Sequence, residues 1–413
     1  MELIRARSDK YPDSEEEYVD KTCYDKKEKS LDIGYQRLKI FNVKLYPELS
    51  LIEKLFIDYN NLKLLPDPTY LPNLTELTCS TNCLNSIPFY PKLTFLNIAH
   101  NSILDCRQYH NSNIEYFDCS YNPGFKLNFR LPKCTQLYIN NNDITTIDLN
   151  LVPKIKLLDC SNNKLDKIIG GANLIELNIQ HNNITQLPYW PQIVRINADH
   201  NKITTLQTYP LLVAINISYN KLTKIADQPK IRKLIATNND LITTNIMPNL
   251  ELVDLAHNNL AHFKMPPKVE YVSLEFNPII KLELDTNVLS HIKELQVGFT
   301  TYTYIYQKYY NSVNSVNVQP HSIKLEEMLR KLNKVFDSKI IDYIFRYFHN
   351  TKFQNRADAL FKITLKLYWK YFRTNNIKTM AELIKTTEFK YLLDNITKLY
   401  YKTIIVTIYF NEY

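Results

Sequence analysis

The sequence predicts an α/β solenoid of short parallel strands, followed by a small α-helical domain. Three observations carry this prediction. An asparagine recurs twelve times at spacings of 19–22 residues, and alternating apolar residues precede each one. After residue 317 the apolar period changes to that of a helix. We therefore expect a charged, flexible leader over residues 1–30, a repeat array of about 14 coils over 31–317, and a basic α-helical domain over 318–413.

The repeating pattern is clear in the segment that begins at Leu174. Leu177 and Ile179 lie two residues apart, so a strand places both side chains on the same inward face. Asn182 then turns the chain out of the strand, and its amide can both donate to and accept from backbone groups of neighbouring coils. Stacked coils bury a core that no single coil could bury alone. The expected structural ladder consists of Asn60, Asn82, Asn101, Asn122, Asn142, Asn163, Asn182, Asn201, Asn220, Asn239, Asn258 and Asn277.

The first and last coils should depart from the pattern, because they shield the core from water. The segment from Leu31 has Gln36 in place of asparagine, and the segment around Leu295 has Thr300 there. Between strands, a proline such as Pro191 recurs two residues before the first apolar position. Proline fixes φ and lacks an N–H donor, so we expect extended segments on the outer, convex side.

The pattern resembles the leucine-rich-repeat family over residues 31–317. That resemblance implies a horseshoe with parallel strands on its concave face, acting as a non-catalytic scaffold that binds a partner protein. The short period is similar to the compact repeats of bacterial effectors. The composition, rich in Asn, Ile and Lys, is similar to repeat proteins of giant amoebal viruses.

Two columns of exposed positions follow from the pattern. The middle column lies between the two inward apolar residues, and the turn column lies immediately before the ladder asparagine. Adjacent coils stand ~4.8 Å apart, so each column is a ladder of neighbouring groups. Tyr and His offer contact area with a polar tip, which suits a protein partner, although a tolerated polar surface explains any single residue equally well. The expected partner-binding residues are Tyr59, Asn97, His100, Asp118, Tyr121, Tyr138, Asp159, Asn178, His181, Asn197, His200, Asn216, Tyr219, Asp254 and His257.

The sequence offers no constellation for catalysis, a cofactor or a metal. His181 and His200 fall in consecutive coils beside Asp199, but a metal site needs converging ligands and a parallel ladder should hold them side by side. The five Gly form neither a P-loop nor GxGxxG, and no CxxC pair occurs. We expect Cys79, Cys119, Cys134 and Cys160 to be small core residues. The sequence therefore predicts no enzyme, no cofactor and no metal.

Location follows from what the ends of the chain contain. The charged start lacks the apolar core of a signal peptide, and no stretch approaches the ~20 apolar residues of a membrane helix. An odd number of cysteines favours reduced thiols. We expect no membrane span and a cytoplasmic protein, in the host cytoplasm if the source is a virus.

Residues 318–413 hold 17 Lys and Arg against 9 Asp and Glu, and we expect Pro320 to start their first helix. This basic excess suits phosphate or anionic lipid, but solvated helix faces are the commoner explanation and nucleic acid is not expected. Ile340, Ile344 and Phe345 resemble the core of an F-box, although its opening Leu-Pro is missing. That resemblance implies an alternative function, a substrate-recruiting subunit of a ubiquitin ligase that contacts an adaptor through these three residues.

Overall fold

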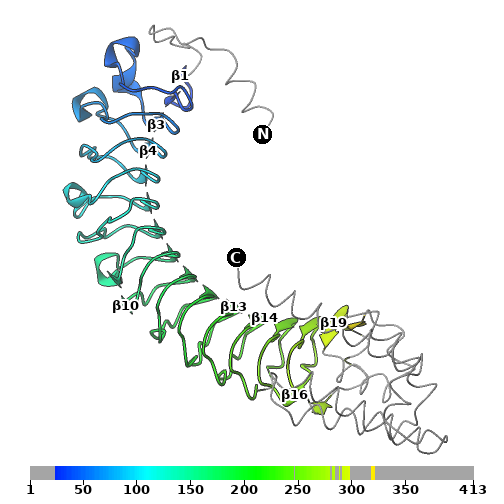
Figure 1. Ribbon diagram of the computed structural model, residues 1–413. Helices are drawn as coiled ribbons and strands as arrows, with labels where there is room; N and C mark the ends of the chain where they lie inside the picture. Colours follow the sequence, from blue (N-terminus) through cyan, green and yellow to red (C-terminus); the bar gives the residue numbers. More distant parts are fainter. Residues whose placement is uncertain are drawn as a thin grey trace, which may run out of the picture.

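A computed structural model of the chain describes residues 24–245, 247–279, 281–283, 288, 291–297 and 318–320. Within them, one sixteen-stranded sheet lines the inner side of a wide arc (Figure 1). Its strands, in spatial order, are β1 (Tyr24–Asp25), β2 (Ser30–Asp32), β3 (Lys54–Phe56), β4 (Glu76–Thr78), β5 (Phe95–Asn97), β6 (Tyr116–Asp118), β7 (Gln136–Tyr138), β9 (Leu157–Asp159), β11 (Glu176–Asn178), β12 (Arg195–Asn197), β13 (Ala214–Asn216), β14 (Lys233–Ile235), β15 (Leu252–Asp254), β17 (Tyr271–Ser273), β19 (Glu294–Val297) and β20 (Val318–Pro320).

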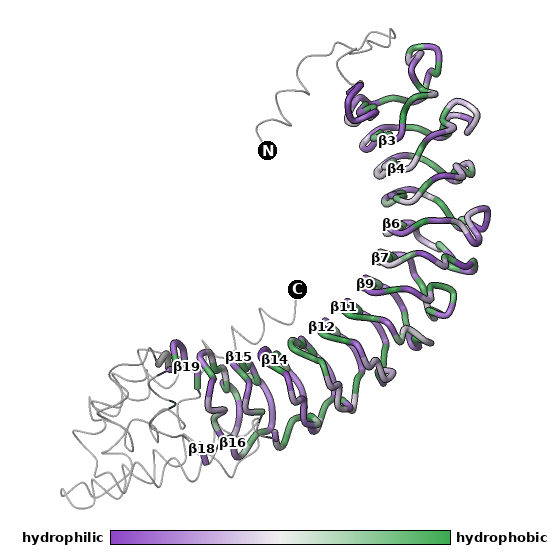
Figure 2. The backbone as a smooth tube through the Cα atoms, turned by 180° about the vertical axis from the view of Figure 1, so that it is seen from behind, coloured by the Kyte–Doolittle hydropathy of each residue, from purple (hydrophilic) through white to green (hydrophobic). Residues whose placement is uncertain are grey.

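From β2 onwards every strand runs parallel to the one before it and in register. Leu177 of β11 pairs with Leu158 on one side and Ile196 on the other, and all three side chains are buried. The residues that flank them point to the opposite face, because strand side chains alternate. In Figure 2 hydrophobic and hydrophilic stretches of chain alternate along each turn of the arc. The predicted solenoid is confirmed.

Each ladder asparagine joins two coils through hydrogen bonds, and every one except the half-buried Asn82 is itself buried. Nδ2 of Asn182 donates to the carbonyl oxygen of Cys160 in the preceding coil at 3.0 Å, and to that of Ile179 in its own coil at 3.0 Å. Its Oδ1 accepts from the backbone N–H of Leu165 at 2.9 Å. Nδ2 also donates to the carbonyl of Gln180 at 3.2 Å, so this one amide side chain bonds to four peptide groups, which need partners when they are buried. The arrangement recurs from Asn60 to Asn277, except that Asn142 bonds only to the preceding coil, donating to the carbonyl of Cys119 and accepting from the N–H of Asn122.

The convex side is more varied than the extended segments predicted from the prolines. Over the part of the chain that the structure describes, it carries five 3₁₀ turns, η2 (Val43–Leu45), η3 (Leu49–Leu51), η4 (Pro68–Tyr70), η5 (Arg107–Tyr109) and η6 (Leu149–Leu151). Two small parallel sheets pair β8 (Thr146–Asp148) with β10 (Lys167–Ile169), and β16 (His262–Lys264) with β18 (Lys281–Glu283). Other return segments, such as the one between β11 and β12, contain neither helix nor strand. The longer coils have room for an extra turn, and the coils of 19 residues mostly do not.

Buried aromatic residues form a second ladder beneath the convex surface. The hydroxyls of Tyr90, Tyr109 and Tyr209 each donate to a carbonyl of the preceding coil, at 2.7, 2.7 and 2.9 Å. Nε1 of Trp190 donates in the same way to the carbonyl of Gly170 at 3.0 Å. Each ring fills the core while its polar tip satisfies a buried carbonyl. Both sides of the solenoid are therefore held by side-chain bonds between coils.

The N-terminal boundary differs from the prediction. The sequence predicts a flexible leader up to residue 30, but residues 24–30 form a hairpin in which β1 pairs antiparallel with β2. Asp25 accepts from the backbone N–H groups of Lys27 and Glu28 at 2.8 and 3.0 Å, which closes the turn. Glu28 also pairs with Lys54 of β3 at 3.2 Å. The hairpin covers the edge of the first coil, where an unpaired parallel strand would otherwise be exposed.

The C-terminal boundary holds a second difference. Pro320 was expected at a helix start, but Val318–Pro320 forms β20, parallel to β19. A proline can end a ladder at an edge strand, where its missing donor costs nothing. Thr300 and the predicted helices of 318–413, with Ile340, Ile344 and Phe345, lie outside the described residues, so the helical domain remains a prediction.

The buried asparagine ladder generates a stability prediction. Replacing Asn182 by Ala leaves three carbonyls and one N–H without the bonds that the amide made. We expect Asn182→Ala to lower the free energy of unfolding by about 3 kcal/mol, measured by urea denaturation. The control is Asn85→Ala at an exposed position in another coil, which should change it by less than about 0.5 kcal/mol. Equal effects of the two variants would contradict the structural importance of the ladder.

The cysteines generate a second prediction. Cys79, Cys106, Cys119, Cys134 and Cys160 are buried and Cys83 is exposed. Burial raises the pKa of the Cys134 thiol to about 12, and raises that of Cys79, Cys119 and Cys160 well above the ordinary range.

Only a thiolate reacts readily with Ellman's reagent. The native Cys83→Ser variant should therefore show one fewer reactive thiol than the native wild type, whereas Cys119→Ser should show no change. Reaction of the buried thiols before unfolding would disprove the packing described above.

Candidate functional site: the concave face

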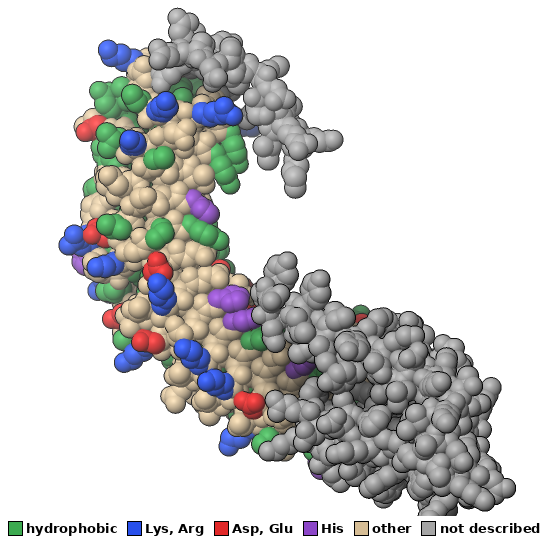
Figure 3. Space-filling view, in the orientation of Figure 1, with side chains coloured by type: hydrophobic (Ala, Val, Ile, Leu, Met, Phe, Trp, Pro, Cys, Tyr) green, Lys and Arg blue, Asp and Glu red, His purple; other side chains and the backbone are tan. Residues whose placement is uncertain are grey.

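The concave surface of the sheet gathers the residues that the sequence singled out. The eight middle-column residues, from Asn97 to Asp254, are half-buried on the inner side of the arc. The seven turn-column residues, from Tyr59 to His257, are exposed. Histidine side chains follow the inner margin of the arc in Figure 3. The structure thus brings these residues onto one continuous face.

Turn-column residues have an unusual backbone conformation. His181 has φ of 54° and His200 has φ of 51°, and all twelve turn-column residues lie in the same left-handed region. In the left-handed region, residues other than Gly and Asn are destabilised by steric contacts of Cβ with the backbone. Eight of the twelve are nevertheless Tyr, His or Phe, namely Tyr59, His100, Tyr121, His181, His200, Tyr219, His257 and Phe276.

Stacking between neighbouring coils explains how this column tolerates aromatic residues. His100 stacks on Tyr121 with ring centroids 3.9 Å apart, and His257 stacks on Phe276 at 4.0 Å. His200 also stacks on Tyr219, at 4.2 Å. Stacked rings stabilise one another and cover each other's faces. The turn column is therefore a row of ordered rings along one side of the concave surface. The ring atoms that are not stacked remain exposed to solvent.

A third column, the leading column, was missed by the sequence reasoning. It lies immediately before the first inward residue of each strand, so it points to the same side as the middle column. Phe95 and Tyr116 stack there with ring centroids 4.0 Å apart. Extending the period-two alternation by one residue towards the N-terminus of each strand would have identified this column.

Leading and middle columns together line an open hollow of about 490 Å³ across β7 to β14. Its lining includes Tyr138, Leu157, Asp159, Glu176, Asn178, Arg195, Asn197, Ala214, Asn216, Lys233 and Ile235. Glu176 and Arg195 form an ion pair within it, and Asn178 Nδ2 donates to Asp159 at 2.9 Å. The hollow is therefore lined by apolar side chains, side-chain amides, and both acidic and basic side chains.

Two middle-column carboxyls are partly desolvated. Burial raises the pKa of Asp118, against the opposing effect of the bonds that it accepts from the N–H and Oγ of Ser120 at 3.0 and 2.6 Å. Burial also raises the pKa of Asp254, opposed by the N–H of Ala256. Each carboxylate serves mainly to cap the end of its own strand.

One trio on this face could hold a metal ion. His181, Asp199 and His200 each place a ligand atom within 4.8 Å of the other two. We expected a parallel ladder to keep such groups side by side. The two rings do lie side by side, stacked with centroids 4.3 Å apart, and Asp199, one residue before His200, adds a third group whose Oδ2 lies 3.2 Å from His200 Nδ1.

The chain is similar in sequence to known leucine-rich-repeat proteins. The chain is 52% identical over 420 residues to a leucine-rich repeat protein of Acanthamoeba polyphaga mimivirus, covering 99% of this chain and 100% of that protein. It is 30% identical over 161 residues to lumican of Rattus norvegicus, covering 35% of this chain and 48% of lumican. No family model matches the chain.

Solved structures share the fold. The leucine-rich repeat protein LIC12759 of Leptospira interrogans superimposes with a TM-score of 0.56 at 17% identity, covering 68% of this chain and 81% of that one. The functional domain of InlJ from Listeria monocytogenes gives 0.53 at 21% identity, covering 65% and 67%. Among the described residues, no helix is long and apolar enough to cross a membrane.

Asp118 generates a pH prediction. Its pKa is higher in the folded than in the unfolded chain, so its contribution to stability is greatest at low pH and is lost as pH rises through the folded pKa. Asn216 holds the equivalent position in its coil, and its Oδ1 accepts from the N–H and Oγ of Ser218 at 3.2 and 2.8 Å. An asparagine at position 118 can therefore keep both bonds without the desolvated charge.

We expect Asp118→Asn to raise the melting midpoint by about 1–2 °C at pH 7, with the gain shrinking towards pH 3. Thermal denaturation followed by circular dichroism measures it. Asp240→Asn, at an exposed position, is the control and should give no gain at either pH. A gain for Asp118→Asn that grows on acidification would contradict the assignment.

Proposed function

The chain belongs to the leucine-rich-repeat proteins, and from that premise we propose that it is a non-catalytic scaffold that binds a partner protein on its concave face. Leucine-rich-repeat proteins generally bind protein partners. The observation that carries the proposal is the continuous surface of stacked rings, amides and paired charges along β3 to β17.

The dimensions of this surface suit a macromolecule. Twelve coils at ~4.8 Å spacing extend the columns over about 50 Å. A stable protein interface buries roughly 800 Å² on each partner, which such a strip can supply. Tyr and Phe side chains, which the turn column also contains, are enriched in interface cores, and Tyr adds contact area at low entropic cost.

The strain in the turn column supports a role in binding. Gly or Asn would satisfy φ near +53° at lower cost than His100 or Tyr219, which have φ of 53° and 51°. Stacking offsets this cost between coils but leaves the ring edges exposed. Rings held in this way are already ordered before binding, so less side-chain conformational entropy is lost when a partner binds.

Charge on the face favours protein over nucleic acid. Along the described strands, Arg195 is paired with Glu176, and Asp118, Asp159 and Asp254 lie in the middle column. Nucleic-acid surfaces instead present a basic track that follows phosphates. A mixed surface of this kind matches a partner with complementary patches of both signs.

The mimivirus relative supports the host cytoplasm as the site of action, and we propose that the partner is a host protein. The ubiquitin-ligase alternative depends on Ile340, Ile344 and Phe345, which lie outside the described residues. It remains a prediction from the sequence.

A matched pair of substitutions tests the binding face. Ala214 lies in the hollow on β13, and the neighbouring coil already carries Arg195 at the same column, so Ala214→Arg should fold normally. Ala172 is exposed on the convex side just after β10, and Ala172→Arg adds the same charge and bulk there.

Full-length wild type and both variants are immobilised, and proteins captured from an Acanthamoeba lysate are quantified by mass spectrometry. We expect a partner that wild type and Ala172→Arg retain equally and that Ala214→Arg recovers at least about tenfold less well. Equal recovery by Ala214→Arg, or loss with Ala172→Arg alone, would count against the concave face.

A further inference from the structure

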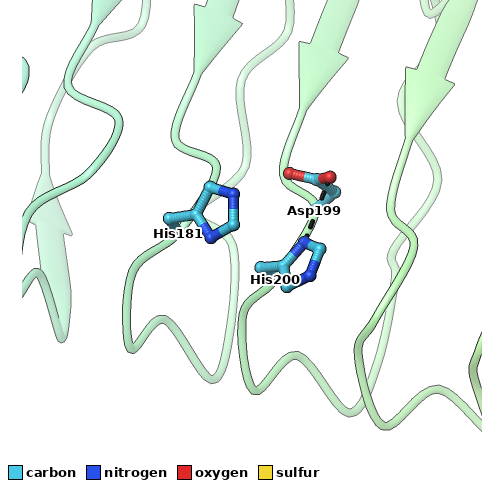
Figure 4. Close-up of side chains that lie close together, drawn as sticks. All are labelled: His181, Asp199 and His200. Atoms are coloured by element: carbon cyan, nitrogen blue, oxygen red, sulfur yellow. Dashed lines mark hydrogen bonds and ion pairs between the residues drawn. The ribbon is translucent and has the colours of Figure 1, made fainter. Parts of the chain in front are cut away.

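We propose that His181, Asp199 and His200 form a binding site for a divalent transition-metal ion of the Zn²⁺ class on the concave face. The three residues follow two adjacent strands, β11 and β12. Figure 4 shows them together at the turns that follow these strands, with the carboxylate of Asp199 beside His200 and the ring of His181 on the neighbouring coil.

The donor atoms are already close. One ligand atom from each residue lies within 4.8 Å of the others. The two imidazole rings stack with centroids 4.3 Å apart and planes 26° apart, and His200 Nδ1 lies 3.2 Å from Asp199 Oδ2. Zn–N bonds of 2.0–2.1 Å place donor atoms about 3.3 Å apart, so donor atoms that now lie within 4.8 Å of one another must approach by at most about 1.5 Å.

The backbone that carries these groups is held in place while the side chains keep room to move. The N–H of His181 donates to the carbonyl of Asp199 at 3.0 Å, which joins the two turns directly. His181 is exposed, and the side chain of His200 is 42% exposed, so both rings can rotate about their side-chain torsions. Rotation of the rings about these torsions can therefore turn the nitrogens towards one shared ion without moving the coils.

Asp199 gives an independent reason to expect a cation. Its Oδ1 is buried and accepts no hydrogen bond from the residues that the structure describes. A buried carboxylate oxygen without a donor is costly. A metal ion held between the two imidazoles would compensate that charge, and Asp199 would supply either a direct ligand oxygen or the carboxylate that orients His200.

The ligand set selects the class of ion. Imidazole nitrogen favours Zn²⁺, Cu²⁺ and Ni²⁺, whereas Mg²⁺ and Ca²⁺ require oxygen ligands. Three protein groups leave at least one coordination position for water. We therefore expect moderate affinity for Zn²⁺ and none for Mg²⁺ at this site.

The chain contains a matched control in the same column. His100 is exposed in the turn column and stacks on an aromatic neighbour, Tyr121, just as His181 stacks on His200. Among the described residues, however, His100 belongs to no trio of ligating side chains. Removing either His100 or His181 therefore disturbs the stacked rings, but only the removal of His181 should disturb metal binding.

Zn²⁺ titration calorimetry on the full chain, purified without a polyhistidine tag, tests the proposal. We expect His181→Ala and His200→Ala each to weaken Zn²⁺ binding at least about tenfold, and Asp199→Asn about tenfold. His100→Ala should bind Zn²⁺ as wild type does, and Mg²⁺ should bind to none of the variants at the same site. Unchanged Zn²⁺ affinity in His181→Ala and His200→Ala would overturn the site.

A second measurement does not depend on affinity. In electron paramagnetic resonance of the Cu²⁺-loaded chain, nitrogen couplings should indicate two imidazoles in wild type and in His100→Ala, and one fewer in His181→Ala. Identical nitrogen couplings in all three proteins would also overturn the proposal. Circular dichroism confirms that each variant retains the wild-type fold, which the exposure of both histidines leads us to expect.

Discussion

The bond between a ladder asparagine and the backbone of the preceding coil is the interaction on which the rest of the structure depends. Each coil makes a sharp turn as it leaves its strand, and the peptide groups of that turn face the core rather than water. The amide of Asn182 satisfies carbonyls of two coils and an N–H of one. Because each amide needs the coil before it, no coil is complete alone, and the array is stable only as a stack.

That constraint fixes the register in which neighbouring strands pair, and the register in turn determines which side chains form the concave face. Since each strand pairs in step with its neighbours, every position of the repeat becomes a column of side chains about 4.8 Å apart. Aromatic residues can then stack along the turn column, and amides can bond along the middle column, as Asn178 does with Asp159. The surface is therefore rigid before any partner arrives.

The first and last coils of such a stack each lack one neighbour. At the first coil, a hairpin covers the edge that would otherwise be unpaired. β1 and β2 pair antiparallel, and Glu28 reaches Lys54 of the next coil. This local solution depends on Asp25 closing a turn, which is a feature of one short segment and not of the repeat. It therefore lies outside what periodicity can reveal.

The sequence by itself determined the solenoid, its parallel register, the inward residues and the ladder asparagines. These follow from a period of 19–22 residues and from strand alternation, which are both local properties of the chain. Only the tertiary structure decided which side chains of different coils meet. The leading column joins the hollow at Ala214, and Asp199 reaches the space beside His181 and His200, because inter-coil spacing and the left-handed turns set those distances. A pattern states which column a residue occupies, but the distance to its neighbour depends on backbone angles and side-chain torsions that the pattern does not contain.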